Sequence, residues 1–236
     1  MIKKYILAIV IFSIFVVSTI GLKVGNQIIP IQVKEVFNNE TSAGIHLKEI
    51  KQEGNGYRLS IFYPETKFKK LNIQIQERIK KEKKDFLEKV KEVENILEGK
   101  TCTFDITFNQ YEYQDYLSFA FEITVYLCGA HPNNYYFTVN YDTKNNEMIT
   151  VETMLKKDSA FLDKLAKESY DILKEEKQVK EYSNEDYLKE GLKAIQSNYE
   201  NFIFDKDKLI VFINRYQIAP YVAGNFEVRI PYGKIM

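Results

Sequence analysis

The apolar residues between positions 68 and 97 recur at the spacing of an α-helix. A period of about 3.6 residues places them on one face, as expected of a helix that packs on a core. That face consists of Phe68, Leu71, Ile75, Ile79, Phe86, Val90, Val93 and Leu97. The charged run at 80–85 predicts a solvated middle of the helix, and Gly99 supplies a stop signal. The pattern therefore predicts one long helix over residues 68–97.

Shorter apolar stretches on both sides of this helix alternate in the manner of β-strands. Residues 44–64 predict a hairpin around a turn at 53–56. The alternating face of its second strand is Tyr57, Leu59, Ile61 and Tyr63. Further strands are predicted at 101–108, 117–127, 135–141, 202–204, 209–213 and 226–230.

Two more helices are predicted between these groups of strands. The first spans 159–177, with an apolar face of Leu162, Leu165, Ala166, Ser169 and Leu173. The second spans 184–199 after a capping box in which Ser183 is the cap and Asp186 stands three residues later. Its buried face is predicted to be Leu188, Leu192, Ile195 and Tyr199.

The order of these elements predicts an α+β protein, in which helices pack on one face of antiparallel sheets. A break near residues 152–158 divides it into an N-terminal lobe, 43–151, and a C-terminal lobe, 152–236.

The N-terminus carries a segment of a different kind. Residues 5–22 contain no charged side chain and follow Lys3 and Lys4, the pattern of a signal peptide or a transmembrane anchor helix. Three interpretations stay open: an uncleaved anchor, a leader cleaved at a weak site in 19–21, and a buried core helix. Under the first two, residues 1–22 direct export and 23–42 form a tether. The remainder is then extracytoplasmic, either secreted or anchored in the membrane through residues 5–22.

Composition narrows the classes of function. The chain has 33 basic and 33 acidic residues, so nothing favours nucleic acid as a partner. The sequence contains no nucleophile elbow, phosphate-binding loop, zinc-protease motif or dinucleotide fingerprint. We therefore expect no cofactor and no enzymatic activity.

The two cysteines, Cys102 and Cys128, predict a disulfide in an oxidising compartment. If 102–111 and 117–127 form a hairpin centred on Asp115, the two residues stand opposite each other. A zinc site made of both cysteines, His131 and His46 is the rival interpretation. We expect the disulfide and no metal.

Two segments combine glycine, proline and aromatic residues in a way that predicts sharp bends. One is 126–133, which reads Tyr-Leu-Cys-Gly-Ala-His-Pro-Asn, and the other is 215–224, followed by Tyr232. Gly129, Pro132, Pro220, Gly224 and Tyr232 are interpreted as residues that shape these bends. The candidate ligand-binding residues are His131, Asn133, Tyr216 and Tyr221. Three roles stay open for the segments: corners of the fold, edges of a binding groove, or catalysis by His131, with or without Cys128.

These segments resemble the paired exported domains of RsiV-type anti-sigma factors, which sense lysozyme, and of PdaC-type peptidoglycan deacetylases. The family signature Gly-Gly-Ala-His-Pro-Asn is present with Cys128 in place of its first glycine, and Tyr-x-Ile-Ala-Pro-Tyr-x-x-Gly is intact at 216–224. The resemblance covers about residues 43–232. With four residues before the apolar run we expect no anti-sigma role, and with the sequence ending at residue 236 we expect no deacetylase domain.

The resemblance implies an exported module of the cell envelope whose partner is lysozyme or peptidoglycan. We expect this module to bind without catalysis. Two alternatives stay open: a cell-wall hydrolase or deacetylase-like enzyme that uses His131, and a structural partner in an envelope complex.

Overall fold

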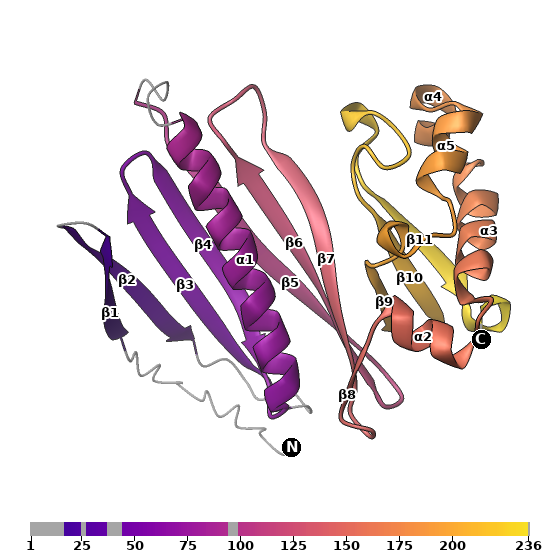
Figure 1. Cartoon of the computed structure of the whole chain (residues 1–236), viewed down its shortest axis with the longest axis horizontal. Helices are drawn as coiled ribbons and strands as arrows, with labels where there is room; N and C mark the ends of the chain where they lie inside the picture. The colour runs from indigo at the N-terminus through magenta and orange to yellow at the C-terminus, as the bar shows by residue number, and fades with distance from the viewer. Residues whose placement is uncertain (1–16, 25–26, 37–43, 94–98, 236) are drawn as a thin grey trace, which may run out of the picture.

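A computed structural model describes residues 17–24, 27–36, 44–93 and 99–235, which form two β-sheets and their helices (Figure 1). The larger sheet has eight strands in the order β1 to β8, and the smaller has three in the order β11-β10-β9. The strands of the larger sheet are β1 (Val17–Val24), β2 (Gln27–Val36), β3 (His46–Gly54), β4 (Tyr57–Glu65), β5 (Cys102–Tyr113), β6 (Tyr116–Tyr126), β7 (Asn133–Asp142) and β8 (Glu147–Ile149). The smaller sheet contains β9 (Phe202–Asp205), β10 (Lys208–Ile213) and β11 (Phe226–Pro231).

The helices fall into two groups. The long helix α1 (Lys69–Val93) crosses the larger sheet, whereas the shorter helices gather around the smaller one (Figure 1). The short elements are α2 (Val151–Lys157), α3 (Phe161–Leu173), α4 (Lys177–Tyr182), α5 (Glu185–Gly191) and the 3-10 turns η2 (Gln196–Asn198), η3 (Tyr221–Ala223) and η4 (Tyr232–Lys234). The α+β class is confirmed, and so are the hairpin at 44–64 and the long helix as far as Val93. Helices α2 and α4 were not predicted.

The larger sheet is mixed and not purely antiparallel. All neighbouring strands run antiparallel except β4 and β5, which pair in parallel from Tyr57 opposite Cys102 to Ile61 opposite Ile106. Because α1 carries the chain back along the sheet between them, the two strands enter in the same direction.

Helix α1 covers one face of this sheet and creates the first core. Its buried residues repeat at helical spacing and include Leu71, Ile75 and Ile79, as predicted. Phe86 stacks on Phe104 of β5 with ring centroids 5.1 Å apart. The apolar positions of the amphipathic pattern are therefore those at which α1 packs on the sheet.

The second core lies between the smaller sheet and its helices. Phe161 and Leu165 of α3 are buried with Leu209 and Val211 of β10. Helices thus pack on one face of each sheet, and the other faces of the two sheets meet.

The smaller sheet meets the larger one through the edge of β9. Ser118 accepts a hydrogen bond from the main-chain N–H of Phe204, and Thr138 accepts one from the N–H of Phe202, at 3.2 and 3.0 Å. Asn140 donates to the carbonyl oxygen of Phe202 at 2.7 Å. Polar side chains of the larger sheet therefore satisfy the main chain of an edge strand that would otherwise be open.

Part of the N-terminal prediction is corrected. Residues 17–22 belong to β1 and not to a helix, and most of the expected tether, 23–42, belongs to β1 and β2. The segment is rich in β-branched residues, which favour strands, and β2 pairs with β3. Residues 1–16 of the expected signal or anchor helix lie outside the described residues. Within the described part, no helix combines the length and apolar character needed to cross a membrane.

The predicted helix over 184–199 is only half right. Helix α5 ends at Gly191, its N-cap is Asn184 and not Ser183, and Ile195 is exposed. The carbonyl oxygen of Gly191 accepts a hydrogen bond from the side chain of Gln217 at 2.9 Å. A residue far away in the sequence therefore contacts the end of the helix. The helical pattern of the sequence could not indicate this contact.

Candidate functional site

The two motif segments meet at one end of the molecule. His131 and Pro132 lie in the loop between β6 and β7, and Tyr221 lies in the loop between β10 and β11. The Tyr221 hydroxyl donates to the carbonyl oxygen of Pro132 at 2.6 Å. The rings of His131 and Tyr221 stack with centroids 3.9 Å apart. We call the surface formed by His131, Asn133, Arg215, Tyr216 and Tyr221 the two-loop surface.

Arg215 completes the stack of side chains. Its guanidinium carbon lies 4.2 Å from the centre of the Tyr221 ring, a cation–π contact. One of its terminal nitrogens donates to the Asn134 side chain at 3.4 Å, and its main-chain N–H donates to the Asn225 side chain at 2.8 Å. Hydrogen bonds from both its side chain and its main chain therefore hold Arg215 in place at the start of the β10–β11 loop.

Tyr216 is displayed at the outer margin of this surface. The residue is 55 % exposed, and its ring centroid lies 6.0 Å from that of Tyr221. Its backbone has a φ of +67°, in the left-handed region that bulky residues rarely adopt. The Tyr187 hydroxyl donates to its carbonyl oxygen at 2.7 Å. A strained backbone that presents a large exposed ring suggests a functional constraint.

Two polar atoms at this end of the molecule are buried without a hydrogen-bond partner among the described residues. They are Oδ1 of Asn133, at the start of β7, and Nε of Arg215. Such atoms are rare in folded proteins and call for an explanation such as a ligand site. His131 is exposed, and its Nδ1 lies 3.1 Å from the Pro132 carbonyl oxygen, to which it donates in the matching tautomer.

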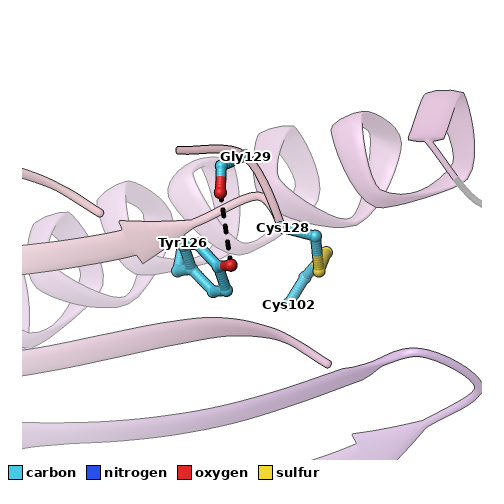
Figure 2. The surroundings of a disulfide bond; sticks show 4 residues. All are labelled: Cys102, Tyr126, Cys128 and Gly129. Carbon is cyan, nitrogen blue, oxygen red and sulfur yellow. Dashed lines mark hydrogen bonds between the residues drawn. A yellow bond between two sulfur atoms is a disulfide. The ribbon is translucent and has the colours of Figure 1, made fainter. Parts of the chain in front are cut away.

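A disulfide between Cys102 and Cys128 anchors the β6–β7 loop, which also carries His131 (Figure 2 shows the disulfide). The predicted pairing is therefore confirmed, but the predicted register is wrong by one position. Thr103 stands opposite Tyr126, which makes Leu127 and not Cys128 the continuation opposite Cys102. The bond forms because Cys128 adopts a φ of +60° and leaves the strand direction. The Tyr126 hydroxyl then donates to the Gly129 carbonyl at 3.3 Å.

The role expected for Gly129 belongs to its neighbour. Gly129 is absent from the glycines with positive φ, whereas Cys128 has that conformation. The signature that this segment resembles has glycine at the position of Cys128, which agrees with the conformational freedom of glycine. Gly224 does adopt a φ of +81°, as its predicted bend requires.

The structure brings most of the candidate residues together and leaves one apart. His131, Pro132, Tyr216 and Tyr221 lie within one set of contacts. Tyr232 is elsewhere: its hydroxyl donates to the Asp205 carbonyl at 2.7 Å, and burial raises its pKa above the ordinary value. Tyr232 therefore ties a corner of the smaller sheet. Pro220 precedes the 3-10 turn η3 that carries Tyr221.

Sequence reasoning missed three residues of this region, Arg215, Asn134 and Asn214. The side chain of Asn214 accepts from the N–H of Tyr136 at 2.7 Å and donates to its carbonyl oxygen at 3.1 Å. Arg215 directly precedes the motif at 216–224, so its place in the sequence could have indicated it as a candidate residue. In the described part of the chain, no cluster of His, Cys, Asp and Glu is placed to hold a metal ion.

Comparison with known proteins agrees with this architecture. Residues 152–233, which lie in the second lobe, match the model of a family described as "Protein of unknown function (DUF3298)". A crystal structure of a DUF3298 family protein from Pseudomonas aeruginosa PAO1 superposes with a TM-score of 0.54 at 14% identity, over 83% of this chain and 93% of the other. It shares the fold.

Two further relatives are similar over most of this chain. Peptidoglycan-N-acetylmuramic acid deacetylase PdaC of Bacillus subtilis (strain 168) is 22% identical over 199 residues. That alignment covers 84% of this chain and 42% of the relative, so the chain spans less than half of the deacetylase's length. A DUF3298 family member from Bacteroides fragilis superposes with a TM-score of 0.49 at 17% identity, over 94% of this chain and 90% of the other.

Proposed function

We propose that the chain is a non-catalytic binding module of the bacterial cell wall, and that its two-loop surface binds the glycan of peptidoglycan. The observation that carries the proposal is the exposed Tyr216 ring, held in a left-handed conformation beside the stacked side chains of His131, Tyr221 and Arg215. A sugar ring has apolar C–H faces and a polar rim. Flat aromatic rings bordered by amide and guanidinium groups are complementary to both.

Binding is favoured over catalysis by the surroundings of His131. Its contacts in the described structure are the Pro132 carbonyl oxygen and the Tyr221 ring. A general base needs a nucleophile or an acidic partner within hydrogen-bond reach. These contacts supply neither, so we assign His131 to ligand binding.

We propose that the protein acts outside the cytoplasm. The disulfide between Cys102 and Cys128 is typical of proteins from oxidising compartments. The similar Bacillus subtilis protein is named for an activity on peptidoglycan. We therefore propose that the N-terminal segment before β1, which begins at Val17, directs export. Mass spectrometry of the mature N-terminus, from the membrane and from the medium, distinguishes a cleaved leader from an anchor.

The decisive experiment is sedimentation of the full chain with insoluble peptidoglycan. We expect Tyr216→Gly and His131→Ala to weaken binding about tenfold or more, because truncation of an exposed aromatic anchor typically has that effect. Tyr216→Gly is informative because glycine accepts the left-handed backbone, so a loss of binding reports the ring. Ile73→Ala is the control, since Ile73 is also exposed but lies on α1.

Three results would overturn the proposal. Wild-type binding by both site variants would exclude the two-loop surface. Release of acetate or reducing sugar from the wall, abolished by His131→Ala, would establish the enzyme alternative. Capture by immobilised lysozyme without capture by peptidoglycan would identify a protein partner instead.

A further inference from the structure

A cavity of about 360 Å³ lies beside the middle of β7, beyond the residues that form the two-loop surface. Helix α1, strands β7 and β8, the start of α2 and the segment 196–201 surround it. Its lining is half polar and includes Gln74, Arg78, Thr138, Asn140, Met148 and Asn201. The cavity therefore joins elements of both lobes.

The cavity lies against a stretch of strand edge that no other strand of the described residues covers. In an antiparallel strand, every second residue directs both main-chain polar groups to the same side. The Asn214 side chain bonds both groups of Tyr136, so Tyr136 faces away from β6. Thr138 and Asn140 face the same way. Strand β8 pairs with β7 from Asn140 onward, and in the described structure no strand pairs with this side of β7 at Thr138.

The same edge already accepts an amide from within the chain. The side chain of Asn214 donates to the carbonyl oxygen of Tyr136 and accepts from its N–H, as the main chain of an adjacent strand would. Thr138 presents the next pair of groups along the edge. A ligand amide placed beyond Asn214 would therefore continue an interaction that the fold already uses.

Two side chains of the lining add polar character. Asn140 is buried, and its Oδ1 has no hydrogen-bond partner among the described residues, although its Nδ2 donates to Phe202. Arg78 lies over the Phe137 ring with 5.1 Å between its guanidinium carbon and the ring centre. The buried Glu82 holds it there through a hydrogen bond of 2.7 Å.

A second hydrogen bond fixes Glu82 in turn. The Tyr135 hydroxyl donates to its other carboxylate oxygen at 2.7 Å. Burial first, and then the Glu82 carboxylate, raise the pKa of Tyr135 far above its ordinary value, so the hydroxyl keeps its proton. Glu82 and Tyr135 therefore hold the Arg78 side chain in a fixed position in the wall of the cavity.

We propose that this cavity binds a short extended peptide, which adds one strand residue to β7 at Thr138 and donates a hydrogen bond to Oδ1 of Asn140. Peptide addition to an open sheet edge is a general mode of recognition. The apolar part of the lining, which includes Met148, Ile149 and Val151, accommodates small side chains. This inference does not depend on the proposed glycan site.

The test is an NMR titration of the full chain with N-acetyl-trialanine amide, a neutral probe that isolates main-chain pairing. We expect shift changes at the amides of Thr138 and Asn140. The same peptide N-methylated at its central residue lacks the donor for the Thr138 carbonyl, and we expect it to bind about fivefold more weakly or worse.

A blocking variant and a matched control complete the design. Gln74→Trp fills the mouth of the cavity from the surface of α1, so we expect it to abolish the shift changes. Gln76→Trp changes another exposed residue of α1 that lies outside the cavity, and it should leave them intact. The proposal is wrong if the wild type shows no shift changes at Thr138, if N-methylation makes no difference, or if the changes appear only around Tyr216 and Tyr221.

Discussion

At the scale of single residues, backbone conformation distinguishes glycines that look equivalent in the sequence. Gly224 has a φ of +81° and a ψ of −158°, a region that is essentially closed to residues with a Cβ atom. Gly129 has no positive φ, and an added Cβ there would meet nothing within 4 Å. Only one of the two motif glycines is therefore required for its backbone conformation.

This difference gives the first prediction. We expect Gly224→Ala to lower the free energy of unfolding by about 1–3 kcal/mol, because the backbone would be strained. Gly129→Ala should stay within about 0.5 kcal/mol of the wild type, as surface substitutions usually do. Urea unfolding of the two variants in parallel measures both values. Equal losses would show that the loops depend on something other than these backbone angles.

At the scale of elements, the end of α5 illustrates a competition between local and distant forces. Alanine is preferred over glycine inside a helix by about 1 kcal/mol, so propensity alone favours Gly191→Ala. A Cβ at this position, however, would lie 1.9 Å from the carbonyl oxygen of Gln217. That oxygen belongs to the loop that carries Tyr216, so the helix and the two-loop surface share one contact.

We expect the clash to outweigh the propensity, because a main-chain atom has little freedom to move away. Gly191→Ala should destabilise the protein by about 1–3 kcal/mol, the usual cost of overpacking, and should shift the NMR signals of Tyr216 and its neighbours. Gly233→Ala is the control, since its Cβ would meet nothing within 4 Å. A stabilised Gly191→Ala variant with unchanged Tyr216 signals would contradict this account.

The helices and strands also differ in how well the sequence predicts them. Local periodicity was sufficient for α1 and for the strands from β3 to β7, because one face of each is buried and the pattern repeats. It failed at the end of α5, where Gln217 intervenes, and at β1, where β-branched residues continue an apolar run. In the proposed site, Tyr216 and Tyr221 could be picked out from the sequence as motif residues. Asn134 and Asn214 could not, because they act only through contacts between distant segments.

At the scale of the whole molecule, the two lobes are joined by more than their connecting chain. A third apolar cluster of Ala120, Ile203, Ile210 and Phe212 lies between the sheets, with Tyr111 and Tyr136 at its margin. The edge of β9 depends on Ser118, Thr138 and Asn140 for its hydrogen bonds. The family match begins at residue 152, yet the partners of β9 lie before it. The second lobe on its own would therefore lack the side chains that satisfy the edge of β9.

The last prediction concerns residues 152–236 produced as a separate fragment. We expect it to be aggregated or loosely packed, because it would expose the apolar face of Ile203, Ile210 and Phe212 together with the unpaired edge of β9. Size-exclusion chromatography and the dispersion of a proton–nitrogen NMR spectrum measure the outcome against the full chain. The same fragment with Ile203, Ile210 and Phe212 changed to threonine should be more soluble if the exposed face is the cause. A monomeric wild-type fragment with a well-dispersed spectrum would show instead that the second lobe folds alone, so that it does not need its contacts with the larger sheet in order to fold.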